Sequence, residues 1–172
     1  MSIAYIIFGS NLGDRLYNLQ EALNLLQKSN IQVIASSPIY QTKAWGNVNQ
    51  DDFLNMVLKI ETSFKPQKLL KVLLKTELQM GRKRGEEQWL PRIIDLDILY
   101  FNEEIVNLPN LKIPHPYIAQ RRFTLIPLTD IAADFVHPVL LETNKKLLKN
   151  CSDHSEVIKT DNTLSIIKTM AK

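Results

Sequence analysis

The sequence has one cysteine, no long apolar run and no strong excess of either charge. Cys151 is the only cysteine in 172 residues, which excludes an internal disulfide and a cysteine-rich zinc site. No run approaches the roughly 18 consecutive apolar residues of a membrane span. The net charge of +3 suits an anionic small substrate, but it is too small for a dedicated nucleic-acid binder. We therefore expect neither a membrane nor a nucleic acid as partner.

The N-terminal segment also lacks the marks of a targeting signal. The apolar run Ile3–Phe8 has no basic flank and passes directly into a Gly-Ser-Asn turn, unlike a signal peptide. The length fits one domain with a real hydrophobic core, and the 45% hydrophobic content argues against disorder. The expectation is a cytoplasmic, monomeric enzyme.

Hydrophobic periodicity predicts alternating strands and helices. Apolar runs bounded by turn residues indicate strands, and leucines at helical spacing indicate helices. The predicted strands are Ile3–Gly9, Ile31–Tyr40, Phe53–Thr62 and Ile93–Phe101; the predicted helices run from Asp14 to Lys28, from Pro66 to Gly81, over Ala119–Ile131 and over Lys145–Asn150. Two long loops, Gln41–Asp52 and Arg82–Pro91, separate these elements, and long loops in compact domains are often functional.

This order, β-α-β-β-α-β followed by helices, is the ferredoxin-like pattern. It predicts an α+β fold in which helices pack on an antiparallel sheet. We expect one domain over residues 1–150, and a tail over residues 151–172 to which the sequence assigns no role.

The segment Ile93–Tyr100 carries two acidic residues within an apolar strand. Side chains alternate along a strand, so Ile94, Leu96, Ile98 and Tyr100 should face one side and Asp95, Asp97 and Leu99 the other. The two aspartates lie roughly 6.7 Å apart along the strand and can reach a shared centre. Carboxylates are ligands that Mg²⁺ prefers, completed by water and phosphate. The alternative is a pair that is solvated or neutralised by Arg82, Arg84 or Arg92.

The basic loop before this strand favours the metal interpretation. Gly81-Arg82-Lys83-Arg84-Gly85 and Pro91-Arg92 flank Trp89. Guanidinium groups bind phosphate through paired donors, and an indole can cover a planar ligand. A charged loop is often only a solvated surface, but next to an acidic pair it indicates a phosphate clamp over metal ions.

Two further motifs differ in what they indicate. His115 lies between Pro114 and Pro116, which constrain its backbone and could aim its ring, although a lone histidine is often structural. The Gly9–Gly13 turn lacks the Gly-Lys-Ser/Thr ending of a phosphate-binding loop. Capping of the following helix by Ser10, Asn11 or Asp14 explains it better.

Taken together, the motifs resemble the 6-hydroxymethyl-7,8-dihydropterin pyrophosphokinase family. The resemblance covers roughly Ile3 to Asn150. Its most specific part is the Pro-Arg-x-x-Asp-Leu-Asp segment that ends at Asp97; the motifs that accompany it in order are Phe53-Leu54-Asn55, Gly81-Arg82-x-Arg84, Trp89-x-Pro91-Arg92 and Pro114-His115-Pro116.

The resemblance implies transfer of the terminal diphosphate of ATP to the pterin hydroxymethyl group, with release of AMP and with two Mg²⁺ ions as cofactors. It also implies a role for each matching residue. The metal ligands would be Asp95 and Asp97; the catalytic arginines Arg82 and Arg92; the ATP-binding residues Glu77, Arg84, Ile98, His115 and Arg121; and the pterin-binding residues Thr42, Trp45, Phe53, Asn55, Trp89 and Phe123. Phe53 and Phe123 would stack on the pterin, and Asn55 would hydrogen-bond to its edge.

Two other functions remain possible from the sequence. The predicted fold with basic loops could bind single-stranded RNA, but no strand carries the expected glycine-aromatic signature. A metal-dependent phosphohydrolase would share the aspartates but would not need Phe53, Asn55 and Phe123. An assay of the nucleotide product separates the three functions.

Overall fold

The computed structural model describes residues 1–44, 50–82 and 91–167. The strands are β1 (Ser2–Ser10), β2 (Gln32–Ser36), β3 (Tyr40–Thr42), β4 (Phe53–Thr62), β5 (Asp95–Phe101), β6 (Val106–Leu108), β7 (Leu111–Ile113) and β8 (Val157–Lys159). The helices are α1 (Arg15–Lys28), α2 (Pro66–Gln79), the short 3₁₀ helix η1 (Ile118–Gln120), α3 (Arg122–Ala132) and α4 (Asn144–Asn150).

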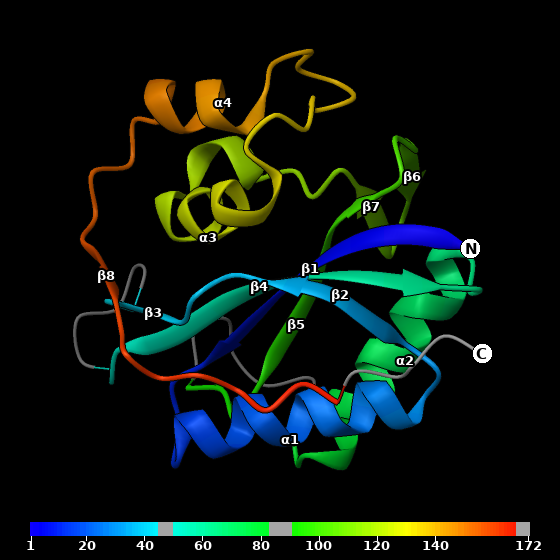
Figure 1. Ribbon diagram of the computed structural model, residues 1–172, viewed down its shortest axis with the longest axis vertical. Coiled ribbons are helices and arrows are strands. Elements are labelled where there is room, and N and C mark those ends of the chain that lie inside the picture. The colour runs from blue at the N-terminus through cyan, green and yellow to red at the C-terminus, as the bar shows by residue number, and fades with distance from the viewer. Residues whose placement is uncertain (45–49, 83–90, 168–172) are drawn as a thin grey trace.

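Within the described residues a six-stranded sheet forms the centre of the fold. Its strand order is β5-β1-β4-β3-β8, with β2 also paired to β4, and all pairs are antiparallel. Helices α1 and α2 cover one face, and α3 and α4 lie over the other (Figure 1). The predicted ferredoxin-like α+β fold is therefore confirmed.

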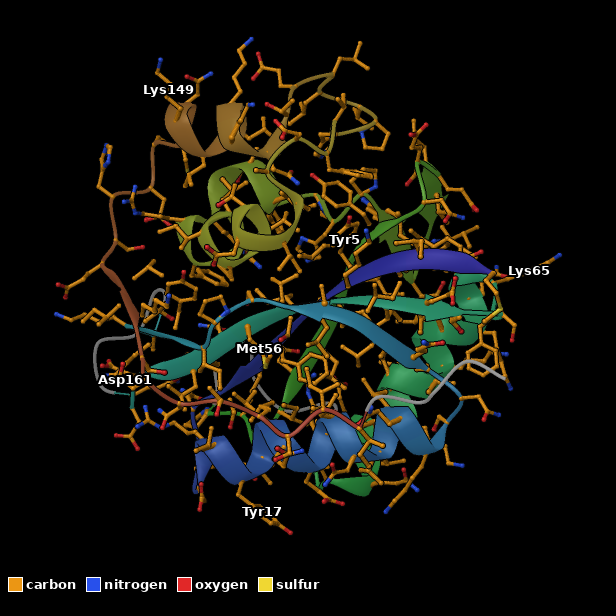
Figure 2. All side chains as sticks on the ribbon, viewed as in Figure 1. Tyr5, Tyr17, Met56, Lys65, Lys149 and Asp161 are labelled. Atoms are coloured by element: carbon orange, nitrogen blue, oxygen red, sulfur yellow. The ribbon has the colours of Figure 1, made fainter. Side chains whose placement is uncertain are left out.

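Each face of the sheet has its own hydrophobic core. Leu19 and Leu23 of α1 and Leu69 of α2 pack on one face, and Leu125 and Leu128 of α3 pack on the other. Figure 2 shows this division: Tyr5 lies on the α3 side of the sheet and Met56 on the α1 side. Because both faces are covered, a polar group in the central strands is buried unless a cavity opens beside it.

The predicted strand over Ile31–Tyr40 is two strands, β2 and β3. Between them the hydroxyl of Ser37 accepts a hydrogen bond from the N–H of Val57 at 2.9 Å, and Pro38 has no N–H to donate. A side chain thus replaces part of the strand ladder, and the edge strand bends. The bend leaves β3 as a separate short strand beside the first half of β4.

The predicted alternation along β5 is right up to Leu99 and wrong at Tyr100. The pairing with β1 passes from Ile6↔Ile98 to Tyr5↔Tyr100, so Leu99 is an extra residue in a β-bulge. Tyr100 therefore packs on the α3 side and donates a hydrogen bond to Asn144 Oδ1 of α4 at 2.7 Å. The bulge lies beyond Asp95 and Asp97, so these two keep the predicted face.

The helix predicted over Ala119–Ile131 is η1 followed by α3. The break is at Arg121, which has an extended backbone (φ −122°, ψ 105°) and serves as the N-cap of α3. Arg121 at this break and Phe123 in the first turn of α3 are predicted site residues. The break therefore decides where both side chains point.

Residues 151–167 pack against the rest of the fold. Strand β8 extends the sheet beside β3, and the chain then runs along α1 (Figure 1). Leu164 and Ile166 pack on the core beneath α1, and the backbone of Ser165 pairs with the amide of Gln20 through bonds of 2.8 and 3.0 Å. The division at residue 150 remains a prediction, but the tail contributes a strand and core contacts. In the part of the chain that the structure describes, no helix is both long and apolar enough to span a bilayer.

Candidate active site

A cavity of about 540 Å³ opens between the α3 side of the sheet and the N-terminal end of α3. It collects predicted site residues that are far apart in the sequence. Those that line it are Thr42, Phe53, Asn55, Arg92, Asp95, Asp97, His115, Arg121 and Phe123. Acidic, basic, aromatic and amide groups thus meet in one space of a size that suits small ligands.

The sheet brings three of the motifs side by side. Gly9 of β1 pairs with Asp95 of β5 on one side and with Asn55 of β4 on the other. Asn55 in turn pairs with β3 and donates a hydrogen bond from Nδ2 to Thr42 Oγ1 at 2.7 Å. This bond fixes the orientation of the amide, so that the Oδ1 atom remains on the side of Gly9.

Gly9 lines the cavity, and sequence reasoning did not predict it as a site residue. A Cβ atom at this position would lie 2.9 Å from Asn55 Oδ1 and 3.6 Å from a ring atom of Phe53. A glycine inside a strand often marks such a close approach. The sequence signal was therefore present at Gly9, but it was assigned to the turn that follows.

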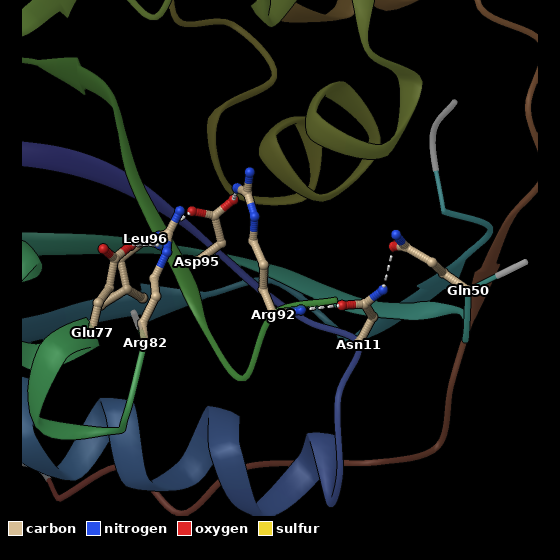
Figure 3. Close-up of polar contacts among 7 residues, drawn as sticks. All are labelled: Asn11, Gln50, Glu77, Arg82, Arg92, Asp95 and Leu96. Carbon is tan, nitrogen blue, oxygen red and sulfur yellow. Dashed lines mark hydrogen bonds and ion pairs between the residues drawn. The ribbon is translucent and has the colours of Figure 1, made fainter. Parts of the chain in front are cut away.

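Asp95 is held by two arginines from the loop before β5. Arg82 Nη1 donates to Asp95 Oδ1 at 2.7 Å, and Arg92 Nη1 donates to Asp95 Oδ2 (Figure 3). The alternative in which arginines neutralise the acidic pair therefore holds for Asp95, which both Arg82 and Arg92 contact. Both catalytic candidates already lie against a candidate metal ligand.

Glu77 anchors this network from α2. Its side chain is 1% exposed, it accepts the N–H of Leu96 at 2.9 Å, and it forms an ion pair with Arg82. Burial alone would lower the pKa of Arg82, but the charges of Asp95 and Glu77 raise it. Asp95 and Glu77 together thus keep Arg82 charged at the point where the chain leaves α2.

Asp97 differs from Asp95, because within the described residues it has no ion-pair partner. Burial, together with the negative charges of Asp95 and Glu77, raises the pKa of Asp97 to about 7. Two adjacent carboxylates that are incompletely neutralised fit a cation site, since a cation relieves both burial and repulsion. Mg²⁺ needs only one or two protein carboxylates when phosphates and water complete its shell.

His115 and Arg121 form the opposite wall of the cavity. The Nδ1 atom of His115 accepts the N–H of Tyr117 at 3.2 Å, which leaves Nε2–H as a donor. Burial and the charge of Arg121 lower the pKa of His115 to about 4, so the ring is neutral at physiological pH. The Arg121 guanidinium lies 4.7 Å from the ring centroid of Tyr117 and 5.7 Å from that of Phe123. Tyr117 is a second cavity residue that sequence reasoning missed.

Asn11 was predicted as a helix cap, and it has a different role. Asp14 caps α1 by accepting the N–H of Tyr17. Asn11 Oδ1 accepts the N–H of Arg92 at 2.7 Å, its own N–H donates to the Arg92 carbonyl at 3.0 Å, and Nδ2 donates to Gln50 Oε1 at 3.1 Å (Figure 3). Asn11 therefore connects the segment just before β5, at Arg92, to the end of the first long loop, at Gln50.

Some predicted site residues lie elsewhere. The side chain of Ile98 is buried in the core on the α1 and α2 side and does not line the cavity. Glu77 does not line the cavity either. It forms an ion pair with Arg82 and accepts the N–H of Leu96. Trp45, Arg84 and Trp89 lie outside the described residues, so their roles remain predictions.

Known proteins resemble the chain in sequence. A model of the family described as 7,8-dihydro-6-hydroxymethylpterin-pyrophosphokinase (HPPK) matches residues 5–133. A 2-amino-4-hydroxy-6-hydroxymethyldihydropteridine pyrophosphokinase of Aquifex aeolicus is 40% identical over 139 residues, which cover 81% of this chain and 86% of that protein. A protein of the same name in Bacillus subtilis is 44% identical over 131 residues, covering 76% of this chain and 78% of its own.

Some relatives are much longer. Folic acid synthesis protein FOL1 of Dictyostelium discoideum is 38% identical over 149 residues, which cover 87% of this chain but 22% of FOL1. A crystal structure of a Plasmodium falciparum HPPK-DHPS triple mutant superposes with a TM-score of 0.69 at 21% identity, covering 87% of this chain and 44% of that one. The structural match shows a shared fold. The extent of the family match and the identity to its members establish that this chain belongs to the 7,8-dihydro-6-hydroxymethylpterin-pyrophosphokinase family.

Proposed function

We propose that the cavity between β5, β4 and α3 is where this chain performs the reaction of its family. As a member of that family the protein is a pyrophosphokinase, which transfers diphosphate from ATP to hydroxymethyldihydropterin in folate synthesis. What carries the assignment of the site is one observation: Asp95 and Asp97 share a single cavity with Phe53, Asn55 and Phe123. A pair of carboxylates suits a metal and phosphate centre, and the aromatic and amide groups suit a flat heterocycle.

One end of the cavity would bind the pterin, and the other end would bind the phosphates of ATP. Asn55, oriented by Thr42, would hydrogen-bond to the pterin edge, and Phe53 and Phe123 would stack on its faces. Asp95 and Asp97 would hold two Mg²⁺ ions, which would offset the phosphate charge and stabilise the attacking and leaving sides of an in-line displacement. The pterin hydroxymethyl oxygen would then lie beside the phosphates of ATP.

The basic residues would position the phosphates. Transfer of a phosphoryl group passes through a loose transition state, so positioning and charge neutralisation provide most of the catalysis. The pterin hydroxyl oxygen forms a bond to the β-phosphorus of ATP and gives its proton to water. The bond between that phosphorus and the oxygen shared with the α-phosphate breaks, and AMP leaves with that oxygen. Arg82 and Arg92, which both donate to Asp95, would bind the phosphates of ATP from the same side of the cavity as the metal ligands. His115 would donate from Nε2–H, and Arg121 would supply a fixed positive charge.

The number of metal ions, the cellular location and the oligomeric state are also proposals. The two-ion count rests on the two carboxylates and the family reaction. A reducing compartment such as the cytoplasm would suit the single cysteine, Cys151, which is a free and buried thiol. The monomer stays a prediction.

An assay of the nucleotide product tests the proposed function. The protein is incubated with ATP, Mg²⁺ and 6-hydroxymethyl-7,8-dihydropterin, and the nucleotides are separated. We expect AMP that forms only when the pterin is present. ADP with orthophosphate in the absence of pterin would indicate a phosphohydrolase instead, and no turnover would favour a binding module.

A further inference from the structure

The first turn of α3 is capped by a residue from the C-terminal segment. The N-cap residue Arg121 makes no side-chain capping bond, so the N–H of Arg122 needs another acceptor. That acceptor is Asp153 Oδ2, at 2.8 Å and 31 residues away in the sequence. The other oxygen, Oδ1, accepts the N–H of Ser155 at 2.9 Å, so the carboxylate is held from both sides.

The carboxylate of Asp153 is in its charged form at neutral pH. Burial would raise its pKa, but hydrogen bonds from Ser155 and from the N–H of Arg122, together with the Arg122 charge, lower it below the ordinary value. A negative charge at a helix N-terminus is also favourable, because the helix dipole is positive there. The capping contact is therefore a charge-assisted hydrogen bond, which is stronger than a hydrogen bond between two neutral groups.

The turn that Asp153 caps carries two residues of the cavity. Arg121 immediately precedes the capped peptide and Phe123 follows it, and both line the cavity. The Arg121 guanidinium lies over the rings of Tyr117 and Phe123. A rotation of this one peptide unit would redirect both side chains.

The same segment also pairs with β3, on the side of the cavity where Thr42 and Asn55 lie. After Asp153 the chain forms β8, in which Val157 pairs with Thr42 of β3. Thr42 accepts the hydrogen bond that orients Asn55. Residues 153–157, which lie beyond the residues matched by the family model, thus contact both the first turn of α3 and strand β3.

We propose that Asp153 is a positioning residue for the pterin pocket, acting through the first turn of α3. It touches neither substrate. Its carboxylate fixes the direction in which Arg121 and Phe123 enter the cavity. The inference rests on the proposed function, because Phe123 is there assigned to the pterin.

Pterin affinity tests the proposal on the full-length protein. The dissociation constant of 6-hydroxymethyl-7,8-dihydropterin is measured by calorimetry with Mg²⁺ and a non-hydrolysable ATP analogue, well below the melting temperature of each variant. Asp153→Ala should weaken pterin binding about tenfold. Loss of a helix cap typically costs about 1 kcal/mol, and here that cost would fall on the turn that positions Phe123. Asp153→Asn keeps an acceptor oxygen in place and should remain within about threefold of wild type. Asp161→Ala, which removes an exposed carboxylate from the same segment, is the matched control and should bind as wild type does.

The outcomes separate the two proposals. If wild type binds pterin and Asp153→Ala binds it equally well, with only a lower melting temperature, Asp153 is merely structural and the inference is wrong while the proposed function stands. If Asp161→Ala loses the same affinity, the effect is one of tail charge and the inference is also wrong. If wild type itself binds no pterin, the proposed function fails, and the inference fails with it.

Discussion

At the scale of single residues, the site depends on close approaches that few residue types allow. Gly9 is the clearest case, because a side chain there would collide with Asn55 Oδ1. Gly9→Ala should force the amide away from the pterin edge and raise the KM for pterin about tenfold, equivalent to one lost hydrogen bond of about 1.4 kcal/mol. Steady-state kinetics with varied pterin measure this. An unchanged KM for pterin in a folded variant would show that Asn55 is not a substrate contact.

Asn11 acts at the same scale but on Arg92, which is proposed to bind phosphate. Asn11→Ala removes the acceptor of the Arg92 N–H and the donor to Gln50, so the base of the loop loses its fixed position. We expect kcat to fall by about tenfold, since two partly buried hydrogen bonds contribute about 1–3 kcal/mol. The pterin dissociation constant should change little. The exposed Asn107→Ala on β6 is the control, and an Asn11 variant with the kcat of this control would contradict the assignment.

The sequence predicted most of the residues that meet in the cavity, but not their supports. Asp95 and Asp97 were predicted from their spacing on one strand, whereas Phe53 and Asn55 were predicted only from the resemblance to the family. Asn11 was read as a helix cap because capping is the local use of asparagine, and its partner Arg92 is distant in sequence. Contacts of that kind depend on tertiary packing and leave no local pattern.

At the scale of elements, strand β5 carries a buried acidic pair whose protonation should make stability depend on pH when no metal is added. The raised pKa of Asp97 means that the folded state binds its proton more tightly than the unfolded state does. The metal-free protein should therefore lose stability as the pH rises from about 4 towards 7, and it should not regain it above 7. Asp97→Asn removes this dependence.

A thermal melt checks the behaviour of β5. In EDTA at pH 8 we expect Asp97→Asn to melt higher than wild type, by about 2–4 °C for each kcal/mol of relieved repulsion. At pH 4 the difference should be small. Addition of Mg²⁺ with ATP should stabilise wild type more than the variant. A variant that melts lower than wild type under all these conditions would mean that the Asp97 carboxylate has a structural role.

Element boundaries were predicted less well than element types. The bend between β2 and β3 arises from the Ser37 hydroxyl, and the bulge at Leu99 arises from the pairing between β1 and β5. Both depend on a neighbouring strand. Periodicity along one segment cannot report them, because Tyr100 is apolar enough for either face.

At the scale of the whole molecule, the C-terminal segment completes the sheet and covers part of α1. Its sequence is polar and weakly patterned, so its packing was not predicted. Deleting residues 161–172 removes Leu164 and Ile166 from the core and the backbone partners of Gln20 and Gln27. We expect the melting temperature to fall by about 4–8 °C, from the loss of about 2 kcal/mol of apolar burial.

The same deletion leaves Asp153 and β8 in place, so pterin affinity should be retained. Calorimetric melting and pterin binding on the one variant test both parts. A deletion variant that melts like wild type would show that the segment along α1 contributes nothing to stability.

The central claim is that Asp95 and Asp97 hold the metal ions for a pterin-dependent diphosphate transfer in this cavity. The most direct measurement is ³¹P NMR of ATP, Mg²⁺ and 6-hydroxymethyl-7,8-dihydropterin with wild type and with Asp97→Asn. We predict that wild type forms AMP and a pterin diphosphate ester in equal amounts. The variant should react about a thousandfold more slowly, a loss of about 4 kcal/mol, while it still binds the pterin. AMP and ester formation at the wild-type rate in the variant would contradict the claim.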